Sequence, residues 1–172
     1  MTASLFHDAI AHHIWATEQV IDRCAGLTPE QLATPAHGTY GPIIDTLRHL
    51  VRTDIWYLSF FPVQQPPPIE EDAEPSLAEL RSAITHNGGL WAEVLGGAHD
   101  GDEETVEHGD GWKFYAPVGL RLAQVVHHGT DHRSQVCTAL TSLGLTPPEI
   151  DLWAYGEATG RSRGVYLERP AQ

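Results

Sequence analysis

The stretch VVHHGTDHRSQV, Val125 to Val136, places three histidines, an aspartate and an arginine among apolar residues that recur at helical spacing. The same spacing continues over residues 118–143 and predicts one long helix. Gly144 is expected to end this helix, and two prolines follow shortly after it. Charged and imidazole groups avoid burial unless they are paired, so their presence in a core-facing helix calls for a chemical reason.

The histidines of this helix do not share one face. At about 100° per residue, His128 and His132 fall on the edge of the apolar stripe, on the same side. His127 and Asp131 point nearly the other way. The pattern therefore predicts that His128 and His132 project together into the protein and that His127 is solvated or paired on the surface.

Two inward imidazoles at positions i and i+4 can bind one metal ion, because neutral ring nitrogens are ligands for Zn²⁺ at about 2.0–2.1 Å. The alternative is a pair of core histidines, each with its own hydrogen-bond partner. A buried polar group without a partner costs about 1–3 kcal/mol. The helix alone leaves both interpretations open.

The remainder of the chain predicts an all-α fold, a four-helix bundle formed by a single domain over residues 1–172. Other apolar patterns predict helices over 5–27, 42–61 and 77–95, with Ser4 as an N-cap, Pro42 at a first position and a Ser76–Glu79 capping box. Residues 28–42 are expected to form a loop. The proline-rich, acidic residues 62–75 predict a long crossover between the second and third helices.

Two shorter regions flank the last helix. Turn residues Gly109 to Gly111 within 104–116 indicate a small hairpin before it. The segment after residue 149 has no clear period, and Leu152, Trp153 and Tyr155 are expected to pack on the bundle.

Composition excludes several classes of partner. The chain has 23 acidic and 10 basic residues and a net charge of -13, which disfavours nucleic acid and anionic membranes. We find neither a spanning segment nor a signal peptide pattern and expect a cytoplasmic protein. Cys24 and Cys137 lie on apolar helix faces, where burial makes a thiol inert, so neither is expected to be a nucleophile.

Four segments of the chain resemble the DinB/YfiT-like family of metalloenzymes, which are four-helix bundles. They are IAHHIWATEQVI at 10–21, TYGPIIDTLRHLVRTDIWYL at 39–58, HHGTDHRSQV at 127–136 and PPEIDLWAYG at 147–156. The resemblance implies that His49 joins His128 and His132 as ligands of a divalent metal, with Zn²⁺ or Ni²⁺ favoured. Periodicity would not have found His49, because it lies outside the main apolar stripe of its helix.

The chain departs from the family pattern at two positions. His13 stands where the family often has Asn, and Ser134 replaces the usual Gly. His13 could line the pocket, carry protons, supply a fourth ligand or be a hydrogen-bonded core residue. Gln135 and Asp131 are candidates for hydrogen bonds that orient the ligands, and Arg133 is expected to pair on the surface.

The superfamily includes transferases that use low-molecular-weight thiols such as bacillithiol or mycothiol. The resemblance therefore implies a metal-dependent S-transferase acting on a small electrophile in detoxification or stress response. A metal-dependent hydrolase and a non-enzymatic bundle that binds metal or a small ligand remain alternatives. The family is commonly dimeric, and Trp56, Tyr57, Phe60 and Phe61 could form part of a homodimer interface.

Overall fold

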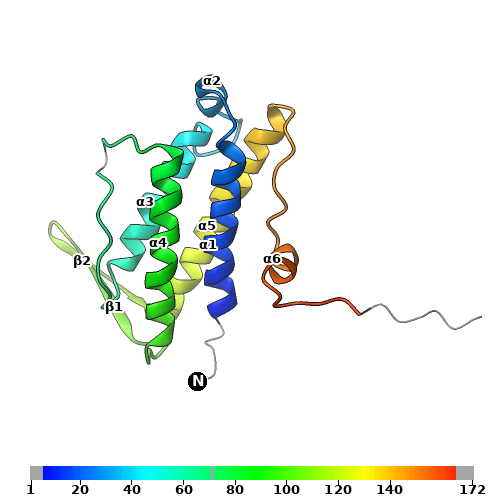
Figure 1. Cartoon of the computed structure of the whole chain (residues 1–172). Coiled ribbons are helices and arrows are strands. Elements are labelled where there is room, and N and C mark those ends of the chain that lie inside the picture. The colour runs from blue at the N-terminus through cyan, green and yellow to red at the C-terminus, as the bar shows by residue number, and fades with distance from the viewer. Residues whose placement is uncertain (1–5, 71, 166–172) are drawn as a thin grey trace, which may run out of the picture.

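The computed structural model describes residues 6–70 and 72–165 of the chain. The described residues are mostly helical, with six helices and one two-stranded antiparallel sheet. Four long helices lie side by side as a bundle, and α1 and α3 each pack against both α4 and α5 (Figure 1). These helices are α1 (His7–Cys24), α3 (Ile43–Leu58), α4 (Leu77–Gly96) and α5 (Val118–Ser142).

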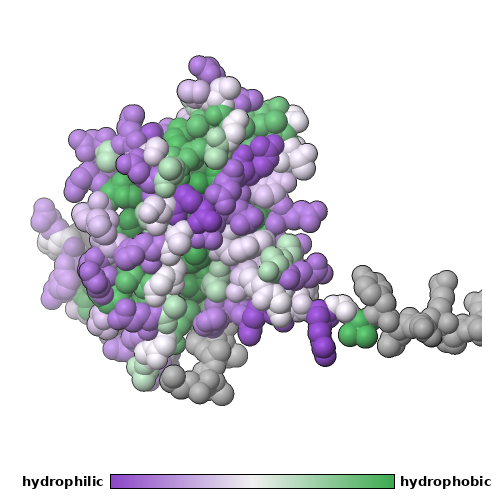
Figure 2. All heavy atoms as spheres, in the orientation of Figure 1, coloured by the Kyte–Doolittle hydropathy of each residue, from purple (hydrophilic) through white to green (hydrophobic). Residues whose placement is uncertain are grey.

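The apolar faces of these helices form one core. Leu47, Leu80, Ile84, Trp91 and Leu140 are fully buried within it. Figure 2 shows that hydrophilic side chains cover much of the outer face of the bundle, with hydrophobic patches between them. Burial of the apolar faces is the main term that holds the helices together, because short helices are marginal in water on their own.

Local signals place most helix ends. The Ser76 Oγ accepts from the Glu79 N–H, and the Glu79 carboxylate accepts from the Ser76 N–H at 2.8 Å, so the predicted capping box is confirmed. Pro42 is the N-cap of α3 rather than its first residue, and α3 ends at Leu58, earlier than expected. Gly144 has φ +72°, a conformation suited to glycine, and follows the end of α5. The predicted N-cap at Ser4 lies outside the described residues.

Two short helices escaped the sequence prediction. α2 (Pro29–Leu32) lies in the expected loop and starts with a Thr28–Gln31 capping box. α6 (Leu152–Ala158) lies in the tail and is capped by the Asp151 side chain, which accepts from the Ala154 N–H. Both are too short to show an apolar period, so only their caps could have revealed them.

The hairpin is confirmed. It consists of β1 (Glu104–Gly109) and β2 (Trp112–Pro117), joined by a turn in which Gly111 has φ +78°. Residues 62–70 and 72–76 belong to the expected crossover from α3 to α4 (Figure 1). Arg52 holds it by donating to the carbonyls of Ile69 and Glu70.

Two expectations about the burial of apolar side chains are wrong. Leu152 and Trp153 are exposed, because only one side of α6 faces the bundle. That side carries Tyr155, whose ring contacts Trp15. Tyr57 and Phe61 are buried in the core and cannot contribute to a surface patch, since they lie on the inward face of α3 and the turn after it. Of the four aromatics proposed for a dimer interface, Trp56 is exposed and Phe60 is half-buried.

None of the helices among the described residues is long and apolar enough to cross a bilayer.

Candidate metal centre

Two helices bring three histidines together. α5 carries His128 and His132 one turn apart on its inward side, and α3 carries His49 opposite them. His132 is buried, while His49 and His128 are half-buried, so the cluster is only partly accessible to solvent. His127 is exposed, as the helical-face argument predicts.

The distances within the cluster suit a single metal ion. One nitrogen from each of the three rings lies within 4.8 Å of the others, and Nε2 of His49 is 3.2 Å from Nε2 of His128. Two ligands of a tetrahedral zinc ion, each about 2.0–2.1 Å from the metal, lie about 3.4 Å apart. The three side chains are therefore already close to the spacing that a shared metal requires.

Burial favours the neutral form of two of these imidazoles, those of His128 and His49. Desolvation, followed by the neighbouring His132 and His49, lowers the pKa of His128 to about 4. Desolvation and His132 also lower the pKa of His49 from its ordinary value. A metal ligand must present an unprotonated nitrogen, so both residues are ready to bind a cation at neutral pH.

Gln135 contacts the cluster from the next turn of α5. Its Oε1 lies 3.2 Å from Nδ1 of His132 and accepts the Tyr40 N–H at 2.9 Å. The structure thus places Gln135 where it can orient a ligand, as expected. Asp131 is exposed, and no hydrogen bond among the described residues links it to the histidines, because it faces away from the bundle.

His13 is a hydrogen-bonded core residue. Its Nδ1 lies 2.9 Å from Nη1 of Arg133, and its Nε2 lies 3.1 Å from Oδ1 of Asp54. Because arginine can only donate, Nδ1 accepts and Nε2 carries the proton that is donated to Asp54. Neither ring nitrogen is left for a metal, so the structure does not support His13 as a fourth ligand.

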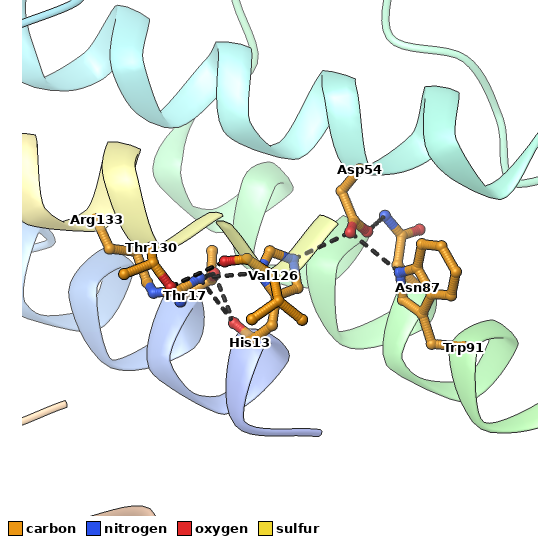
Figure 3. Close-up of polar contacts among 8 residues, drawn as sticks. All are labelled: His13, Thr17, Asp54, Asn87, Trp91, Val126, Thr130 and Arg133. Carbon is orange, nitrogen blue, oxygen red and sulfur yellow. Dashed lines mark hydrogen bonds and ion pairs between the residues drawn. The ribbon is translucent and has the colours of Figure 1, made fainter. Parts of the chain in front are cut away.

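Asp54 is the centre of a buried polar network that sequence reasoning missed (Figure 3). Its carboxylate is 1% exposed and accepts from His13 on α1 and from Asn87 and Trp91 on α4. The only signal in the sequence was an aspartate that interrupts the apolar stripe of α3. The network joins all four long helices through side chains.

The expected surface pairing of Arg133 is wrong. Its side chain is 2% exposed and donates to His13, Thr17 and Thr130. Desolvation lowers its pKa to about 10, so it stays charged at neutral pH. Arg133 directly follows the ligand candidate His132 in the sequence, and its side chain enters the network that faces α1 (Figure 3).

Gly129 is required for the close approach of α1 to α5. A Cβ built on Gly129 would lie 2.1 Å from Nδ1 of His13 and 2.7 Å from Nη1 of Arg133. No side chain fits there without moving the buried network. The glycine in HHGTDH therefore serves packing, and it sits between the two ligand candidates of α5.

Replacing Gly129 with alanine should lower the free energy of unfolding by about 1–3 kcal/mol, the usual cost of overpacking a core. The matched control is Gly89→Ala on α4, where a Cβ meets nothing within 4 Å. Alanine is the better helix former, so this control should gain up to about 1 kcal/mol. Urea unfolding measures both. Equal stabilisation of the two variants would disprove the close approach.

Comparison with known proteins places the chain in a family. A search of curated proteins finds no match. The family model described as "DinB family" matches residues 1–166, nearly the whole chain. Because this match covers nearly all of the sequence, we conclude that the chain belongs to the DinB family.

Proposed function

We propose that the protein is a metal-dependent enzyme whose metal is held by His49, His128 and His132. The observation that carries this proposal is the convergence of three imidazole nitrogens within 4.8 Å of one another. Membership of the DinB family supports it. Zn²⁺ and Ni²⁺ are the candidates we favour, because imidazole suits both.

Three protein ligands suit catalysis better than a structural role, because they leave a fourth tetrahedral position for water or substrate. When bound, such a metal lowers the pKa of a coordinated water to about 7 and holds a coordinated thiol as its thiolate. A cavity of about 490 Å³ adjoins His49 and is lined also by Tyr40, Arg48 and Asp45. It has room for a small substrate beside His49.

The reaction we propose is transfer of a low-molecular-weight thiol, such as bacillithiol or mycothiol, to an electrophile. The nucleophilic sulfur would have to come from outside the chain. Burial raises the pKa of Cys24 to about 12, and it also raises that of Cys137. Both cysteines are thus poor nucleophiles, as expected. Conjugation forms a carbon–sulfur bond and breaks the bond between that carbon and its leaving group, which departs with the electron pair. The thiol proton passes to solvent or to the leaving group.

The test is a conjugation assay with a small electrophile, using bacillithiol, mycothiol and glutathione in turn. The protein is assayed with Zn²⁺ or Ni²⁺ and after stripping with a chelator. Turnover that needs both thiol and metal is the expected result. Metal-dependent turnover without thiol would indicate the hydrolase instead. No turnover under any of these conditions would indicate a bundle that only binds metal or a small ligand. His127→Ala is the control variant, because its ring is exposed and should not affect turnover.

A further inference from the structure

One side-chain oxygen connects the proposed metal centre to the loop in front of it. Oε1 of Gln135 lies 3.2 Å from Nδ1 of His132 and accepts the backbone N–H of Tyr40 at 2.9 Å. Gln135 and Tyr40 are far apart in the sequence, and Tyr40 lies in the loop between α2 and α3. The contact therefore ties this loop to α5.

The bond to His132 decides which ring nitrogen can bind a metal. The amide oxygen can only accept, so Nδ1 of His132 carries the proton. The opposite nitrogen, Nε2, then keeps its lone pair. A hydrogen bond of this kind also holds the plane of a ligand ring, which is why partners of ligating histidines affect metal affinity.

The bond to Tyr40 places an aromatic ring over the cluster. The Tyr40 ring stacks on His49, with centroids 4.3 Å apart and planes inclined by 18°, and meets His132 edge-on at 5.4 Å. The outer part of this side chain is in solvent, with 56% of the residue exposed. Tyr40 and His49 also line the same cavity, so the ring borders the space next to this ligand candidate.

We propose that Gln135 is a positioning residue that sets the His132 tautomer and, through the same oxygen, holds Tyr40 beside the metal centre. The inference rests on the proposed function, because it assigns His132 a metal-binding role. Metal on Nε2 makes the Nδ1–H of a histidine more acidic and a stronger donor. Metal binding should therefore strengthen the contact between His132 and Gln135, which orders the loop that carries Tyr40. Metal binding and ordering of this loop are thus linked.

The test compares two substitutions of matched length. Gln135→Met removes the acceptor, whereas Gln135→Glu keeps an acceptor oxygen in the same place. Co²⁺ is the probe, because its visible absorption reports both binding and ligand geometry. Gln135→Met should weaken Co²⁺ binding about 10- to 100-fold and change the spectrum, since loss of such a partner has this effect on metal sites. Gln135→Glu should restore most of the affinity.

Amide hydrogen exchange at Tyr40 is the second readout, and it needs no metal. Exchange should be slowed in the metal-free wild type, slowed further by Co²⁺, and fast in Gln135→Met under both conditions. His127→Ala is the control, because its ring is exposed on the other side of α5 and takes no part in either contact. Its Co²⁺ affinity should stay within a few-fold of wild type.

The outcomes separate this inference from the proposed function. A wild type that binds no Co²⁺ overturns both. A wild type that binds Co²⁺, with unchanged affinity and unchanged Tyr40 exchange in Gln135→Met, overturns the role of Gln135 and leaves the metal centre standing.

Discussion

Replacing His128 or His132 with alanine is expected to remove most of the bound metal. Each substitution takes away one of three converging nitrogens, and the remaining two cannot complete the site. His49→Ala should behave in the same way. Elemental analysis after equilibration with Zn²⁺ or Ni²⁺ measures the loss. His127→Ala should keep the metal, because its ring is exposed on the other side of α5. Equal loss in His127→Ala would contradict the assignment of faces.

Thermal unfolding with and without a chelator extends this prediction to stability. A ligand that binds only the folded protein stabilises it by about 2.7 kcal/mol when its free concentration is 100 times the dissociation constant. Chelation should therefore lower the melting temperature of the wild type. A variant with both His128 and His132 replaced should stay folded, because the apolar core does not depend on the ion. Its melting temperature should not change when the chelator is added. A wild type that cannot be loaded with metal would refute the metalloenzyme proposal.

Replacing Asp54 with asparagine should lower the free energy of unfolding by about 3–5 kcal/mol, the usual cost of leaving a buried charge without its countercharge. Asparagine has nearly the same shape but removes the negative charge that compensates Arg133 through His13. Its amide would also bring a donor against the donors of Asn87 and Trp91. Urea unfolding at neutral pH measures the change.

Asp45→Asn is the matched control for this substitution. Asp45 lies on the same helix and pairs with Arg48 at 3.3 Å, but its side chain is half exposed. Exposed pairs of this kind contribute about 0–1 kcal/mol. Similar losses in the two variants would mean that the buried network adds no more to stability than a surface pair.

Several features of the fold follow from short stretches of sequence. The α5 pattern predicted both the helix and the side on which His128 and His132 lie, because helical geometry relates residues four apart directly. The Ser76–Glu79 capping box and Gly144 marked helix ends through bonds and backbone angles that involve only neighbouring residues. Apart from α2 and α6, the elements were anticipated from such local signals.

The role of the other polar residues was not visible in this way. His49 lies outside the main apolar stripe of α3, and only the resemblance to a family indicated it. Asp54 looked like an interruption of an apolar face, and Arg133 looked like a surface charge. Each of them acquires its partner from another helix, and periodicity within one helix carries no information about which residue will lie opposite.

The sequence by itself determined the helices, their inward faces and the direction in which His128 and His132 point, because these depend on contacts between residues a few positions apart. Only the tertiary structure decided that His49 meets them, that His13 and Arg133 belong to a buried network around Asp54, and that Gln135 joins His132 to Tyr40. The physical reason is that hydrogen bonds and metal ligation act over about 2–3 Å. Such distances between separate helices are set by the packing of the whole core.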